Sequence, residues 1–177
     1  MTNQNLKSTT EVKDNIFDTK YLVDMLELLN NTDFKPNNLA NRSTWPLGWA
    51  GATHRIFSCN IFHRFTRHLI KHNINFTLVE MYIKMYEYLE KVFKMKQPTI
   101  LNSINVNLQF KGMDGSYHKD YGPKAILFMI GEEAKGGEFI IKKNNKEEKI
   151  AFKNGRVIYF DPTAEHRGLA FSDPYKP

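Results

Sequence analysis

The sequence has little cysteine and no long hydrophobic run, and each shortage excludes a class of protein. Its single cysteine, Cys59, cannot form an internal disulfide, so nothing indicates an oxidising compartment. The longest purely apolar run, residues 125–130, is far too short to cross a bilayer. The polar first residues lack the apolar segment of a secretory signal. These absences predict a cytoplasmic protein that does not enter a membrane.

The composition that remains is that of a globular domain. A chain of 177 residues with 41% hydrophobic and 25% charged residues can bury a core as a single domain. Its 25 Lys and Arg outnumber its 19 Asp and Glu, which gives a net charge of +6. This modest excess is compatible with an anionic partner, such as a nucleic acid or a small dicarboxylate, and equally with a general role in solubility.

Residues 1–98 are predicted to form a mainly helical support region. Asp18 is a suitable N-cap for a helix whose apolar residues recur at helical spacing as far as Leu29. A second helix is predicted to begin at Thr77, which forms a capping box with Glu80, and to end before Pro98.

Residues 60–72 are predicted to form a third, basic helix. The side chains expected to face inward are Phe62, Phe65 and Leu69, and those expected to face outward are Arg64, Arg67, His68, Lys71 and His72. His68 and His72 have the i,i+4 spacing of a metal-binding pair, but a solvated basic face is the better interpretation. The same face is compatible with binding to the phosphates of a nucleic acid.

From residue 99 onward the pattern changes to that of short strands. Residues 104–110 alternate apolar and polar side chains, as a half-buried strand does. Four further strand-like segments follow between turn signals: 125–130, 138–142, 149–152 and 156–160. Short strands without helices between them predict an antiparallel sandwich or barrel. Helices first and strands second predict an α+β fold with the helices packed on one face of the sheets.

His118, Asp120 and His166 are the candidate metal ligands. His118 and Asp120 are two residues apart, so on a strand they project to the same face, and His166 follows the predicted strand 156–160. Two His and one carboxylate form the facial triad of non-haem Fe(II) oxygenases, which leaves coordination positions open for a cosubstrate and O₂. The alternative is a surface His beside a surface Asp, because the His-x-Asp pattern often arises by chance.

The segments around these residues occur in a distinctive order. A strand and a glycine-containing turn, 105–115, lead into Tyr117-His118-Lys119-Asp120 and then an apolar strand. Gly136-Gly137-Glu138-Phe139 comes next, and finally the segment 154–161, which contains a glycine, a short apolar run and a Phe, precedes Glu165-His166-Arg167-Gly168. From about residue 104 to its end, the chain resembles the 2-oxoglutarate- and Fe(II)-dependent dioxygenase superfamily, and within it the prolyl-4-hydroxylase-like group.

The resemblance implies that residues 99–177 form a double-stranded β-helix, or jelly roll, as the catalytic core of a single domain. It implies that His118, Asp120 and His166 bind Fe(II). It also implies that Lys176, ten residues after His166, binds the distal carboxylate of 2-oxoglutarate. A basic residue beyond Pro177 is the alternative for this role. The implied reaction consumes O₂ and 2-oxoglutarate and releases succinate and CO₂, with ascorbate as a further candidate cofactor.

Three other residues near the triad are weaker candidates for binding the cosubstrate. Arg167 is a second cation beside the predicted site, although a surface or salt-bridging role is the simpler interpretation. Tyr117 and Gln109 precede the first His and are candidates to line the cosubstrate pocket, with ordinary packing as the alternative.

The expected substrate is a protein or peptide residue, with a prolyl residue as the first candidate. A member of the same superfamily that oxidises nucleic acid is one alternative, and the basic segment 60–72 is its motivation. A cupin-like barrel that binds a metal without turnover is the other. The sequence does not indicate an oligomeric state.

Overall fold

A computed structural model of the chain describes residues 10–37, 56–63, 76–95 and 100–172. The described residues belong to two compact units, and each unit is assembled from separate stretches of chain. The first unit contains residues 10–17 and 109–172. The second contains the remaining described residues, which lie between 18 and 108.

The second unit contains both helices, α1 and α2. Helix α1 spans Thr19–Asn30, and the carboxylate of Asp18 caps it by accepting a 2.7 Å hydrogen bond from the backbone N–H of Tyr21. Met25 and Leu29 are its buried residues. The predicted N-cap and apolar side of this helix are therefore confirmed.

Helix α2 spans Phe76–Val92 and begins one residue before the predicted start. It buries four apolar residues that recur at helical spacing: Leu78, Tyr82, Met85 and Leu89. The helix ends before Pro98 is reached, in a left-handed residue, Lys94, with φ of 47°. Hydrogen bonds from Met95 N to Glu90 O and from Lys94 N to Lys91 O complete a Schellman motif.

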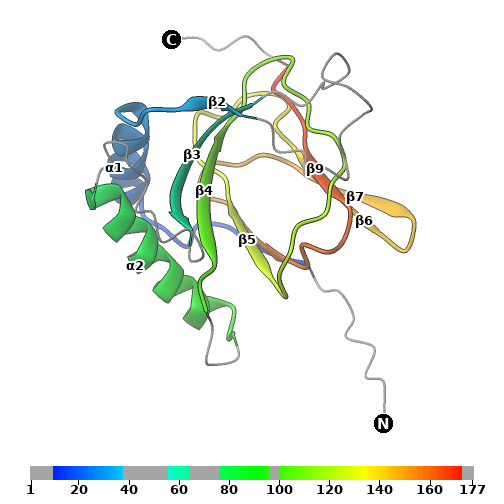
Figure 1. The fold of residues 1–177 in the computed structure, drawn as a ribbon, viewed down its shortest axis with the longest axis horizontal. Helices are drawn as coiled ribbons and strands as arrows, with labels where there is room; N and C mark the ends of the chain where they lie inside the picture. Colours follow the sequence, from blue (N-terminus) through cyan, green and yellow to red (C-terminus); the bar gives the residue numbers. More distant parts are fainter. Residues whose placement is uncertain (1–9, 38–55, 64–75, 96–99, 173–177) are drawn as a thin grey trace. The chain divides into compact units, whose positions relative to one another are not determined.

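An antiparallel sheet completes the second unit, in the order β2-β3-β4, with both helices on one of its sides (Figure 1). Its strands are β2 (Lys35–Asn37), β3 (Ile56–His63) and β4 (Ser103–Leu108). The prediction of a helix over 60–72 is wrong for residues 60–63, which lie in β3. Phe62 pairs with Ile104 of β4, so cross-strand pairing overrides the local helical period. Residues 64–72 lie outside the described part of the chain.

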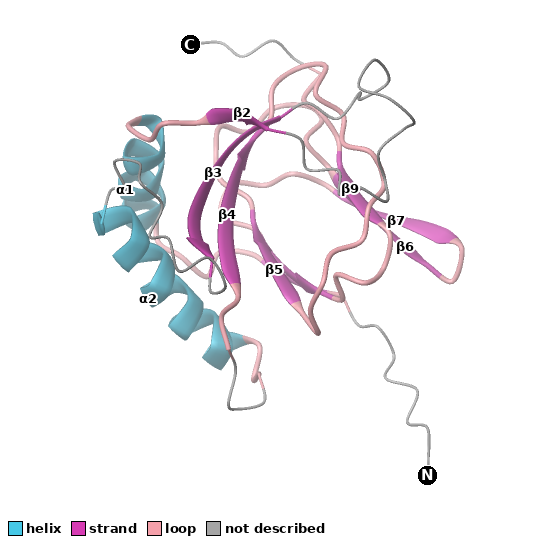
Figure 2. Ribbon diagram, in the orientation of Figure 1, coloured by secondary structure: helices cyan, strands magenta, loops and turns pink. Residues whose placement is uncertain are grey.

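The first unit contains two antiparallel sheets of three strands each (Figure 2). One has the order β1-β8-β5, with β1 at Glu11–Lys13, β8 at Val157–Phe160 and β5 at Ala125–Phe128. The other has the order β7-β6-β9, with β7 at Lys146–Ile150, β6 at Phe139–Lys143 and β9 at His166–Gly168. Five of the observed strands, β4 to β8, lie within three residues of their predicted positions.

Side chains of both sheets form the core of the first unit. Its buried members are Met129, Phe139, Ile141, Ile150, Ile158 and Phe160. Phe139 and Phe160 come from different sheets, and their ring centroids lie 4.9 Å apart. The described residues thus form antiparallel sheets with two helices, which is a mixed α and β fold. The jelly-roll arrangement of the strands stays a prediction. Neither of the helices in the described ranges is long and apolar enough to cross a membrane.

Two regions of the first unit are shaped by backbone with positive φ. Asn144 and Asn145, with φ of 48° and 62°, form the two-residue turn between β6 and β7. Positive φ at both residues gives the turn the backbone twist that a tight hairpin requires. Gly136 has φ of 92° and lies against the chain that follows β9. There Gly137 N donates to Ala170 O and Ser172 N donates to Lys135 O.

Candidate metal centre

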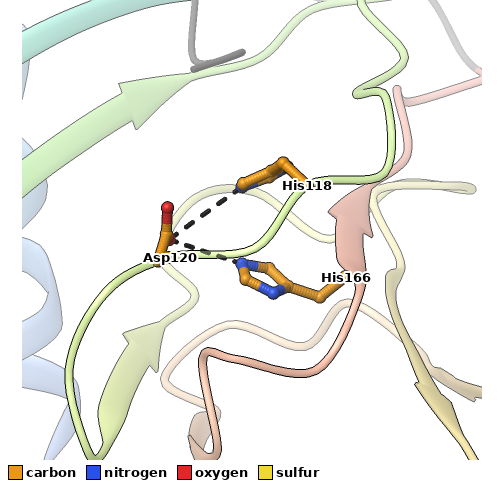
Figure 3. Close-up of side chains that lie close together, drawn as sticks. All are labelled: His118, Asp120 and His166. Carbon is orange, nitrogen blue, oxygen red and sulfur yellow. Dashed lines mark ion pairs between the residues drawn. The ribbon is translucent and has the colours of Figure 1, made fainter. Parts of the chain in front are cut away.

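The first unit brings His118, Asp120 and His166 together, although 45 residues lie between Asp120 and His166 in the sequence. Figure 3 shows the three side chains pointing toward one another. Nε2 of His166 lies 3.5 Å and Nε2 of His118 lies 4.0 Å from Oδ2 of Asp120. One nitrogen or oxygen atom of each residue lies within 4.8 Å of the others. Among the described residues, this is the one group of three or more His, Cys, Asp or Glu side chains with such an arrangement.

Backbone hydrogen bonds set the positions of all three residues. His118 N donates to His166 O at 3.1 Å, and His166 N donates to His118 O at 3.0 Å, so the two residues form a reciprocal antiparallel pair. Asp120 N donates to the carbonyl of the fully buried Pro162 at 2.9 Å. These bonds join the segment that contains His118 and Asp120 to the segment that contains His166.

A tight turn between β8 and β9 brings His166 to this position. The carboxylate of Asp161 accepts hydrogen bonds from Thr163 N at 2.9 Å and from the Thr163 hydroxyl at 2.7 Å. The Asp161 carbonyl accepts a further bond from Ala164 N at 3.2 Å. Local bonds from an Asp side chain stabilise such a turn without help from other segments.

Both imidazoles are oriented by the same device. Nδ1 of His118 lies 3.0 Å from Ser116 O, and Nδ1 of His166 lies 2.9 Å from Ala164 O. A carbonyl oxygen only accepts, so Nδ1 is the donor in each ring, and Nε2 is the nitrogen that faces Asp120. A backbone carbonyl behind a metal-binding His is a common orienting partner.

The site is buried on its histidine side and open on its carboxylate side. His118 is 8% exposed and His166 is 4% exposed, whereas the side chain of Asp120 is 58% exposed. The rings of Phe139 and Phe160 pack against His166, with centroid distances of 5.7 and 5.0 Å. A hydrogen bond with His166 is the main reason that the pKa of Asp120 lies below its usual value, despite partial burial. The carboxylate is therefore ionised at neutral pH.

The structure uses Gln109 for backbone contacts. Its side-chain amide donates to Met113 O at 2.9 Å and to Gly168 O at 3.4 Å. These bonds tie the turn before the site to the end of β9. The packing alternative for this residue thus has direct support, while its predicted cosubstrate contact stays a prediction.

Tyr117 and Arg167 lie together on the face of the β7-β6-β9 sheet that is directed away from the candidate ligands. Ile141 pairs with His166 and shares its buried face, so the neighbouring Lys142 projects to the other face. Tyr117 packs against Lys142, whose Nζ lies 3.8 Å from its ring centroid, and against Arg167, whose Cζ lies 4.4 Å from it. Lys176 lies outside the described residues.

Some residues that shape the site have no recognisable sequence signal. Ser116 and Ala164 act through their backbone carbonyls, which any residue type would provide. A recurring offset was nevertheless present, because each carbonyl belongs to the residue two positions before a His.

The sequence matches neither a protein-family model nor a curated protein sequence. Its structure matches the crystal structure of an oxidoreductase of the 2OG-Fe(II) oxygenase family from Burkholderia pseudomallei, with a TM-score of 0.69 and 14% sequence identity. The match covers 93% of this chain and 79% of that one. At this level of identity it shows that the chain shares the fold of a 2OG-Fe(II) oxygenase structure.

Proposed function

We propose that this protein is an Fe(II)- and 2-oxoglutarate-dependent dioxygenase that hydroxylates a residue of a protein substrate. The observation that carries the proposal is the convergence of His118, Asp120 and His166, in which the Nε2 atoms of both rings face an ionised carboxylate. The fold shared with a 2OG-Fe(II) oxygenase structure supports it.

The donor set fits iron. Two imidazole nitrogens and one carboxylate oxygen are the ligands of the facial triad, and they occupy one side of a six-coordinate ion. The same donors also bind zinc, and the shared fold is the reason to prefer iron. The open side of the site, next to the exposed Asp120, leaves room for the remaining coordination positions.

The residues would divide the work as follows. His118 and His166 hold the metal from the buried side through Nε2, and the carbonyls behind them keep both rings in the metal-binding tautomer. Asp120 supplies the negative charge. Phe139 and Phe160 keep water away from the His166 side of the centre. Fe(II) and 2-oxoglutarate, when bound, supply the oxidising chemistry, in which O₂ is consumed, succinate and CO₂ are released, and the substrate gains a hydroxyl group.

Two parts of the proposal rest on the sequence resemblance. Lys176 is proposed to bind the distal carboxylate of 2-oxoglutarate, as a compact charge suited to a carboxylate partner. A prolyl residue is the first substrate to test. Nothing in the described residues favours a nucleic acid substrate, since residues 60–63 of the predicted basic helix belong to β3.

Succinate formation tests the proposal directly. Anaerobically purified protein would be given Fe(II), 2-oxoglutarate and O₂, because such enzymes turn over slowly even without their substrate. We expect succinate from the wild-type protein and only background from Asp120→Ala. The variant should fold normally because its side chain is largely exposed. Equal succinate from both proteins would refute the assigned site. Tight metal binding without succinate would instead indicate a cupin-like barrel without turnover.

A further inference from the structure

Tyr117 and Arg167 lie directly beside the paired histidines. In the antiparallel register that pairs His118 with His166, the residue opposite Tyr117 is Arg167. The guanidinium carbon of Arg167 lies 4.4 Å from the centre of the Tyr117 ring, which is within the range of a cation–π contact. A side-chain pair therefore lies immediately beside the pair of candidate ligands.

The same tyrosine also contacts the two other strands of the sheet. Nζ of Lys142, in β6, lies 3.8 Å from its ring centroid. The hydroxyl of Tyr117 donates a hydrogen bond to the carboxylate of Glu147, in β7. Glu147 is the cross-strand partner of Lys142. Lys142 is itself held by Glu165 through a 3.2 Å ion pair. One aromatic ring thus links the segment before His118 to β6, β7 and β9.

Backbone hydrogen bonds join the same segment to β9. His118 pairs with His166 through an isolated bridge rather than within a regular strand. A further backbone hydrogen bond runs from Gly115 N to Gly168 O, at 2.8 Å. The contacts of the Tyr117 side chain add to these backbone bonds on the face of the sheet that is directed away from the site.

We propose that Tyr117 is a positioning residue, which holds His118 opposite His166 at metal-binding distance by binding Arg167, Lys142 and Glu147 on the outer face of the sheet. This inference rests on the proposed metal site. It assigns Tyr117 a role outside the centre, because its ring lies on the face directed away from the two imidazoles.

Binding of Co(II), an O₂-stable substitute for Fe(II), tests the role without enzyme turnover. We expect Tyr117→Leu to weaken Co(II) affinity by about 10- to 100-fold, the usual effect of losing a residue that orients a metal ligand. We also expect it to change the visible absorption spectrum of the bound ion. The substitution leaves every formal charge in place, so a change in the net charge near the metal cannot explain the loss. Tyr117→Phe keeps both cation contacts and should restore most of the affinity and the spectrum.

Tyr121→Leu is the matched control. It makes the same substitution directly after Asp120 in the sequence, at a side chain that is 98% exposed. This variant should bind Co(II) as the wild-type protein does. Thermal unfolding of the metal-free proteins would show which variants are folded. If Tyr117→Leu does not fold, Tyr117→Val takes its place, since β-branched side chains favour extended backbone.

The outcomes separate this inference from the function on which it rests. Wild-type affinity and spectrum in a folded Tyr117→Leu protein would overturn the positioning role and leave the metal site intact. A wild-type protein that binds no Co(II), or binds it equally well after His118→Ala, would overturn both. Weaker binding in Tyr117→Leu that Tyr117→Phe does not restore would refute the role of the two cation contacts, with Arg167 and Lys142.

Discussion

At the scale of single residues, Asp14 illustrates how distant segments of the first unit are joined. Its carboxylate accepts two hydrogen bonds of 2.8 Å from Arg156 and one of 3.3 Å from Lys153. Arg156 also donates to the carbonyl of Ala151 at 2.7 Å, which fixes its guanidinium. The Arg156 hydrogen bonds are the main cause that lowers the pKa of Asp14 from 3.8 to about 2. Such two-pronged pairs are stronger than ordinary surface ion pairs.

The lowered pKa predicts how stability depends on pH. The folded protein binds a proton at Asp14 less readily than the unfolded chain does, so the pair stabilises the fold fully above the unfolded pKa of 3.8. That contribution, roughly 2 kcal/mol, is lost as the pH falls from 3.8 through about 2. We expect Asp14→Asn to lower the free energy of unfolding by about 1–2 kcal/mol at pH 7 and by much less at pH 2.5. Urea titrations at both pH values measure the difference.

Asp24→Asn is the control for Asp14→Asn. Asp24 pairs with Lys20 at 2.6 Å one helical turn away, and both side chains are well exposed. Removing this pair should leave the free energy of unfolding almost unchanged at both pH values, because exposed ion pairs contribute little. A cost of Asp14→Asn that is equally small, or that does not shrink in acid, would show that the pair contributes little.

At the scale of elements, Gly136 sets how closely the chain before β6 approaches the chain after β9. A Cβ atom at this position would lie 2.6 Å from Ala170 O and 2.8 Å from Ser172 N. Both are backbone atoms, which cannot rotate away, and the φ of 92° is already unfavourable for other residues. We expect Gly136→Ala to destabilise the protein by about 3 kcal/mol or more, as measured by chemical denaturation.

Gly112 offers a control with the same backbone strain and no contact. Its φ is 81°, but nothing lies within 4 Å of a Cβ atom placed there. Gly112→Ala should therefore cost only about 1 kcal/mol, the penalty of the left-handed conformation itself. If the two variants were equally stable, the close approach at Gly136 would have no energetic importance.

The same scale separates what could be predicted from the sequence and what could not. Helix α2 was predictable because four of its apolar residues share one face and Glu80 lies one turn before its ion-pair partner, Lys84. Strand β3 was not, because Phe62 and the residues after it also fit a helical period. Only the pairing of β3 with β4, which lies some 40 residues downstream, resolves that ambiguity.

The candidate site shows the same limit. The two-residue spacing of His118 and Asp120 was sufficient to predict that they share a face, and the structure places them together with His166. Alternation also predicts that Tyr117 and Arg167 lie on the face opposite the histidines. It does not predict which side chains they contact there, because Lys142 and Glu147 belong to other strands.

At the scale of the whole molecule, the two units are interleaved along the chain. Strand β1, near the beginning of the described residues, pairs with β8, so that Glu11 lies opposite Tyr159. Strand β4 belongs to the second unit, together with β2 and β3. The change from helical to strand-like sequence near residue 99 therefore does not coincide with the division between the two units.

This interleaving predicts that residues 99–177 do not fold alone. Without β1 and Asp14, the first unit would lose one edge of a sheet and an ion pair worth roughly 2 kcal/mol, out of a typical total of about 5–15 kcal/mol. We expect poor dispersion of amide resonances from this fragment, in contrast to the full chain. A well-dispersed spectrum together with full-length Co(II) affinity would contradict the expectation and support 99–177 as an independent core.

The turn from Asp161 to Glu165 has a consequence for how the length of this chain can vary. Strand β9 exposes alternate residues to opposite faces, so losing or gaining one residue in the turn would exchange His166 for Glu165 or Arg167 at the site. An insertion of two residues would keep the facing of the strand, and a bulge would absorb one. Length changes between relatives are therefore expected here in steps of two residues. An odd change without a bulge would direct the side chain of His166 away from the metal centre.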